Sequence, residues 1–102
     1  MHTIQLDAGS WKTPYDFRAV LKSAIGAPEW HGDTIAAFLD SIFGGGMNAL
    51  KPPYTLKVVN TKQLAPELKK LVRDLSSAME ETRMRRLART GEDVAARLEI
   101  EN

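Results

Sequence analysis

Apolar and polar side chains alternate at the start of the chain. Ile4 and Leu6 share one side of residues 3–7, and the turn-forming residues 8–10 follow them. The pattern predicts a first strand over residues 3–7. Its brevity is typical of an edge strand or an early strand.

Residues 14–25 carry the pattern of an amphipathic helix. Their apolar positions recur at the helical period: Phe17, Val20, Leu21 and Ala24. Thr13 offers an N-cap hydroxyl, Pro14 fits the first turn, and Gly26 is placed to end the helix in a left-handed conformation. We therefore predict a helix over residues 14–25.

A second amphipathic helix is predicted after a tight connection over residues 27–32. Its apolar side chains follow the i, i+3, i+4, i+7 spacing of one helix face: Ile35, Phe38, Leu39 and Ile42. Asp33 or Thr34 is the expected cap, and the glycines at 44–46 stop the helix.

Residues 54–59 form a β-rich run after a proline-containing loop. Tyr54, Leu56 and Val58 alternate with polar residues, but Val59 breaks the polar side, which indicates a central strand. The final stretch, residues 94–100, alternates again and predicts a last strand.

Between these strands, residues 65–90 keep a helical apolar stripe. The phase of the stripe shifts near residues 80–83, so a kink or two separate helices are expected there, with Met84 and Leu87 turned inward. Gly91 is the expected stop.

The predicted elements follow one another in the order β-α-α-β-α-β. Helical connections between strands require parallel pairing, because each strand must return to the same end of the sheet. We therefore expect an α/β fold with a three-stranded parallel sheet packed with helices. The length of 102 residues predicts a single domain over residues 1–102.

Composition adds limits to this picture. A hydrophobic fraction of 43% and a charged fraction of 26% are those of a globular domain, and the absence of Cys excludes disulfides and thiolate chemistry. The net charge of +1 indicates neither a strongly basic nor a strongly acidic partner surface. With no apolar run of membrane-spanning length and no leader-like start, we expect a cytoplasmic protein without membrane contact.

The residues that usually carry catalysis are sparse. His2 and His31 lack zinc-binding spacing, no G-x-S-x-G turn occurs, and the glycines at 44–46 lack the context of a phosphate loop. Glu80 and Glu81 are adjacent and so point to different helix faces. We expect no enzymatic activity, no metal and no cofactor.

The densest cationic run consists of Arg83, Arg85, Arg86 and Arg89. On a helix these side chains spread over more than one face, which favours a solvated surface. Nucleic-acid binding is the alternative interpretation. The nearby acidic residues weaken it, because they repel phosphate: Glu80, Glu81, Glu92 and Asp93.

One stretch is similar to a known family: Ala27-Pro28-Glu29-Trp30-His31-Gly32-Asp33-Thr34-Ile35-Ala36-Ala37-Phe38-Leu39-Asp40. It resembles the segment P-x-Y-Y-G-x-N-L-D-A-L-x-D of the barstar family, between the first and second helices. Pro28, Gly32, Ala37 and Asp40 match in identity and spacing, and Trp30 keeps an aromatic ring. The resemblance implies the same order of strands and helices.

Barstar-like proteins inhibit small secreted ribonucleases, so the resemblance implies an inhibitor or immunity protein that binds a nuclease or related toxin. The second helix and the loop before it plug the nuclease cleft, with Asp40 in place of substrate phosphate and Trp30 as a rim contact. The expected partner-binding residues are Trp30, His31, Asp33, Ala36, Ala37 and Asp40. The alternative is a barstar-fold adaptor or oligomerisation module with a different protein partner.

The sequence departs from the family at several charged positions. Ala36 replaces an aspartate, and a gapless alignment places Arg86 and Thr90 where the best-known member has acids. His31 and Thr34 replace a tyrosine and an asparagine.

Three of the expected binding residues also have a purely structural interpretation. Asp40 is then a solvent-facing helix residue, Trp30 covers the edge of the core, and His31 is a loop side chain with local hydrogen bonds.

Overall fold

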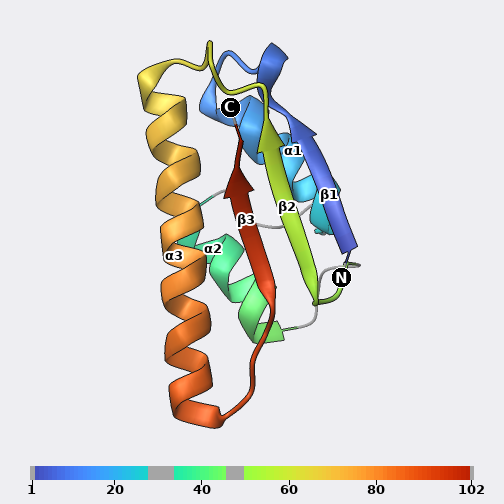
Figure 1. The fold of residues 1–102 in the computed structure, drawn as a ribbon, viewed down its shortest axis with the longest axis vertical. Helices are drawn as coiled ribbons and strands as arrows, with labels where there is room; N and C mark the ends of the chain where they lie inside the picture. The colour runs from blue at the N-terminus through green and yellow to red at the C-terminus, as the bar shows by residue number, and fades with distance from the viewer. Residues whose placement is uncertain (1, 28–33, 46–49, 102) are drawn as a thin grey trace.

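The computed structural model describes residues 2–27, 34–45 and 50–101 (Figure 1). Its strands are β1 (His2–Asp7), β2 (Tyr54–Val59) and β3 (Ala96–Ile100). They form one parallel sheet in the order β1-β2-β3. This confirms the predicted α/β class and three-stranded parallel sheet, with residues 54–59 in the centre.

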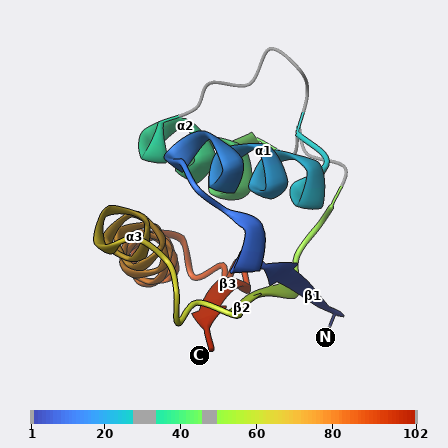
Figure 2. The ribbon, with the colours of Figure 1, turned by 90° about the horizontal axis from the view of Figure 1, so that it is seen from above.

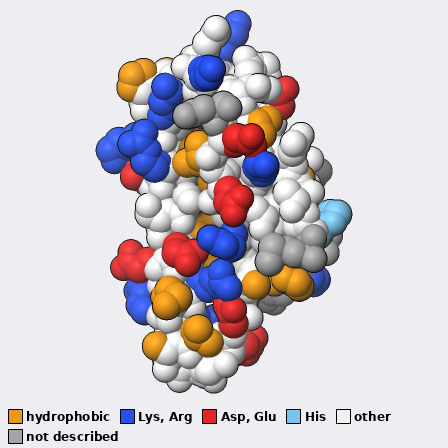
Figure 3. Space-filling view, in the orientation of Figure 1, with side chains coloured by type: hydrophobic (Ala, Val, Ile, Leu, Met, Phe, Trp, Pro, Cys, Tyr) orange, Lys and Arg blue, Asp and Glu red, His pale blue; other side chains and the backbone are white. Residues whose placement is uncertain are grey.

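The helices lie on one side of the sheet. They are α1 (Pro14–Ile25), α2 (Ile35–Leu39) and α3 (Pro66–Thr90), with a 3₁₀ turn over Ala8–Ser10 and a wide π-helical turn over Asp40–Gly45. Figure 2 shows α1 and α2 together above the sheet and α3 alongside β3. The described helices leave the opposite sheet face uncovered, and Figure 3 shows acidic and basic side chains interspersed across it.

The start and end of α1 follow from its sequence. The Asp16 N–H donates to Thr13 Oγ1 over 3.4 Å and the Thr13 N–H donates to Asp16 Oδ2 over 3.0 Å, which closes a capping box. Backbone N–H donors of Lys12 and Thr13 hold the pKa of Asp16 below its usual value. Gly26 ends the helix with φ 66°, as predicted.

The core lies between the sheet and the helices. From the central strand, Leu56 and Val58 are fully buried, and Leu56 pairs with Ile4 on one side and Leu98 on the other. The helices contribute the remaining large buried side chains, which include Phe17, Leu21, Ile25, Phe38, Leu68, Val72, Leu75 and Met79. Burial of this apolar surface is the main force that holds α1, α2 and α3 against the sheet.

The prediction of a kink or two helices near residues 80–83 is wrong, because α3 is one helix of 25 residues and Figure 1 shows it without a sharp bend. Met84 and Leu87, expected to turn inward, are 57% and 37% exposed. The inward face continues in phase beyond Met79, but with polar residues three, four and seven positions further on: the half-buried Thr82, Arg83 and Arg86. The change of composition along one unbroken face imitated a change of phase.

The other element boundaries differ by small amounts from those predicted. Thr34, one of the two expected caps, is the N-cap of the second helix. The helix becomes a π-helical turn at Asp40. The last strand begins at Ala96, two residues later than predicted, and Ile100 at its end is 41% exposed.

Candidate functional site

The residues predicted to bind a partner fall into two groups. Trp30, His31 and Asp33 lie outside the described residues. Ala36 and Ala37 belong to α2, and Asp40 follows directly where the π-helical turn begins. Ala36 and Asp40 are exposed, and Ala37 is partly buried.

Local structure explains why Asp40 is exposed. Thr34 caps α2 by accepting the Ala37 N–H at 3.0 Å, and the Phe38 side chain, 2% exposed, fixes the helix to the core. Ala36 and Asp40 are four residues apart and therefore share a helix face. With Phe38 turned inward, this face remains accessible.

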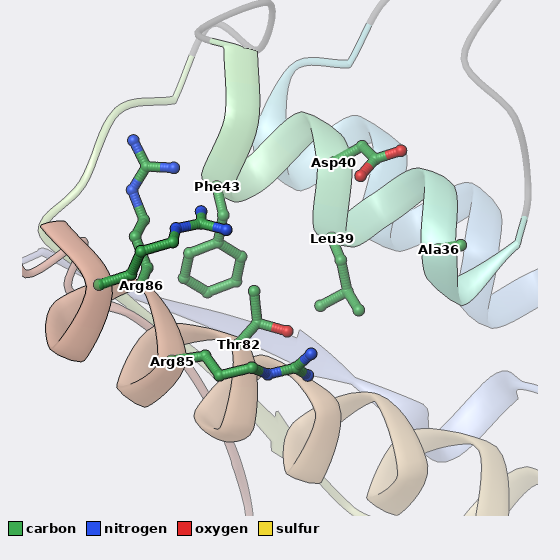
Figure 4. A pocket seen from close by; sticks show the side chains of 8 residues that line it. Ala36, Leu39, Asp40, Phe43, Thr82, Arg85 and Arg86 are labelled. Atoms are coloured by element: carbon green, nitrogen blue, oxygen red, sulfur yellow. The ribbon is translucent and has the colours of Figure 1, made fainter.

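The Ala36–Asp40 face borders a groove of about 340 Å³ between α2 and α3 (Figure 4). One wall comes from α2 and the turn after it: Ala36, Leu39, Asp40 and Phe43. The other comes from α3: Thr82, Arg85, Arg86 and Arg89. Each set has the i, i+3, i+4, i+7 spacing of one helix face, so each wall of the groove is formed by one face of its helix.

The polar groups of the groove are poorly neutralised. Arg85 meets Glu81 at 3.6 Å, and both side chains are 73% exposed, so this ion pair contributes little. The Arg86 Nε is buried and has no hydrogen-bond partner among the described residues. Asp40 has no ion pair with any described residue, and Figure 4 shows its carboxylate directed away from α3.

Arg83 is separated from the other arginines of the run. Its Nε and Nη2 donate to the two carboxylate oxygens of Asp93 over 2.7 and 2.9 Å. This bidentate contact lowers the pKa of Asp93 and raises the pKa of Arg83. Arg83 ties α3 to the segment before β3, and it does not line the groove.

Asp40 and Ala36 are predicted from the sequence, but the opposite wall of the groove is not. The sequence favours a solvated face for the α3 arginines. Arg85 and Arg89 are indeed exposed, but Arg86 is half-buried. Their spacing from Thr82 was the available signal. What the pattern lacked was the information that α2 lies against this part of α3.

Among residues 2–27, 34–45 and 50–101, His, Cys, Asp and Glu side chains form no group of three or more suited to hold a metal ion. The helices of these ranges include none long and apolar enough to cross a bilayer. The side chains that line the groove carry guanidinium, hydroxyl, carboxylate and apolar groups.

A scan against models of protein families found no match, and a search of curated proteins found no similar sequence. The resemblance to barstars consequently depends on the stretch from Ala27 to Asp40 and on the order of the elements.

Proposed function

We propose that this chain is a barstar-like protein-binding domain, an inhibitor or immunity protein that binds a nuclease or related toxin. The second helix and the loop before it form the contact surface, and Asp40 is its central charged residue. The single observation that supports this most directly is the exposure of Asp40 on a helix fixed by a buried Phe38. An exposed carboxylate on a rigid element can pair with partner cations at little entropic cost.

The fold supports the same proposal. The strands and helices have the order that the resemblance implies, and Ala36, Ala37 and Asp40 occupy α2 and the start of its following turn. A carboxylate that becomes buried among cations at an interface centre dominates affinity in many complexes.

The groove favours the second candidate, a barstar-fold adaptor with a partner other than a ribonuclease. Arg85, Arg86 and Arg89 lie across the groove from Asp40. A strongly basic nuclease would be repelled by three guanidinium groups so close to its contact residue. Both candidates share the same surface and differ in the charge of the partner.

Replacing Asp40 by alanine is expected to weaken partner binding by about 2 kcal/mol or more, which is roughly 30-fold in Kd. Wild-type protein and the Asp40→Ala variant serve as baits in lysate from the native source, and the Kd of the recovered partner is then measured by calorimetry. Asp74→Ala is the matched control, because Asp74 is an exposed α3 aspartate outside the groove.

The proposal requires that Asp74→Ala retains the partner with wild-type affinity. Equal recovery and equal Kd for wild type and Asp40→Ala would show that the α2 surface is not the binding site. A highly basic partner supports the nuclease inhibitor, whereas an acidic partner supports the adaptor.

A further inference from the structure

The α2–α3 groove combines an apolar floor with one cationic wall, which α3 supplies. Leu39 and Phe43 are directed toward α3 in Figure 4, and Thr82 and Arg85 extend between the two helices. Phe43 is 6% exposed and Leu39 partly buried, so these side chains are held in place by the core. A rigid apolar floor of this kind can contact the methylene groups of a short side chain that ends in a charged group.

The cationic groups of the groove have unused hydrogen-bonding capacity. The buried Arg86 Nε has no hydrogen-bond partner among the described residues, so this donor of the guanidinium group is unused there. Arg89 forms no ion pair with a described residue, and Arg85 has only the 3.6 Å contact with Glu81. Guanidinium groups bind carboxylates through paired N–H donors, so an acidic side chain is the natural complement.

We propose that the α2–α3 groove is a receptor for a carboxylate side chain of an acidic segment in the protein partner, with Arg86 and Arg85 as its ligands. Thr82 contributes a hydroxyl donor to the same carboxylate. Asp40 lies at the rim of the groove. Its negative charge disfavours a second acidic side chain of the partner next to the bound carboxylate and favours a basic side chain there. This inference rests on the proposed protein-binding function and specifies the chemistry of the partner.

An acidic protein segment fits the groove better than a nucleic acid does. The space of about 340 Å³ holds a side chain and its neighbours, and its floor is apolar. A nucleic-acid backbone needs a continuous row of cations. Here Arg83 forms an ion pair with Asp93, and the exposed Glu81 and Glu92 flank the arginines. The cations therefore do not form a continuous row.

The test is a titration of isotopically labelled protein with hexaglutamate peptide, followed by NMR shifts of backbone amides and arginine Nε–H groups. We expect saturable shifts confined to α2 and to residues 82–89, weakened by added salt because exposed charges are screened. Arg86→Gln should raise the Kd about tenfold, the usual effect of one charge-assisted contact. Arg97→Gln on the exposed side of β3 is the matched control and should leave the Kd unchanged.

Arg85→Gln provides a second variant in case Arg86→Gln disturbs folding, because the Arg85 side chain is 73% exposed. It should also weaken the binding of hexaglutamate. Inorganic phosphate and a short single-stranded oligouridine are the comparison probes. Tighter binding of oligouridine than of hexaglutamate would overturn the inference in favour of nucleic acid, and so would shifts spread evenly over the surface.

The two proposals fail in different ways. If Asp40→Ala loses the natural partner while hexaglutamate shifts no residue of the groove and Arg86→Gln keeps the partner, the carboxylate receptor is wrong and the protein-binding proposal stands. If the natural partner is insensitive to every groove substitution, the proposed function fails even where hexaglutamate binds.

Discussion

Replacing Phe38 by alanine is expected to lower the free energy of unfolding by about 3 to 5 kcal/mol, the usual cost of deleting a buried phenyl ring. Phe38 is 2% exposed and is the buried side chain of α2 itself. The loss combines the free energy of transferring the ring from the core to water with the cost of the cavity left in the core beneath α2. For a chain of this size, the melting temperature should fall by roughly 15 to 30 °C.

Chemical denaturation of the purified variant measures this loss. Tyr15→Ala on α1 is the control, because the Tyr15 side chain is 69% exposed and its removal should change stability by about 0.5 kcal/mol or less. A Phe38→Ala variant as stable as the control would mean that α2 is not fixed to the core and that the groove wall is not rigid.

Raising the pH from about 10 to about 12 is expected to remove about 2 to 3 kcal/mol of stability through Tyr54 alone. Tyr54 opens the central strand with 1% of its surface exposed, and burial raises the pKa of its hydroxyl to about 12. An unfolded tyrosine ionises near pH 10, so in this window the unfolded chain releases a proton that the folded chain retains. The stabilising contribution is complete below pH 10 and is lost as the pH approaches 12.

Tyr54→Phe isolates this effect, because phenylalanine keeps the ring and removes the ionisable hydroxyl. Urea denaturation of both proteins at a series of alkaline pH values gives the difference in free energy of unfolding. The wild type should lose stability relative to Tyr54→Phe from pH 10 upward. Parallel curves for the two proteins would show that the Tyr54 hydroxyl ionises equally well in the folded state.

The fold was largely predictable because its elements have strong local signals. Thr13, Pro14 and Gly26 define α1 by capping chemistry that operates within a few residues, and the structure confirms both ends. The parallel sheet followed from chain connectivity alone. The prediction of a kink or break at residues 80–83 was wrong because the inward face of α3 becomes polar after Met79. A pattern of apolar residues cannot locate a buried face that consists of polar residues.

The candidate site was predictable only in part. Asp40 and Ala36 were found through resemblance, and the structure places both on an accessible face. The position of Arg86 in the groove wall depends on a contact between two helices that are far apart in sequence, and no local sequence pattern predicts such a contact. The same distance explains why Phe43 was not recognised as the floor of a groove.

The most direct test of the account is hydrogen–deuterium exchange of the chain with and without its captured partner. We expect exchange to slow at residues 35–43 and 82–89, because the proposed contact surface includes both walls of the groove, while the amides of β1 remain unchanged. Protection of α1 or of the strands alone, with residues 35–43 exchanging as fast as in the free protein, would contradict the assignment of the α2 surface as the binding site.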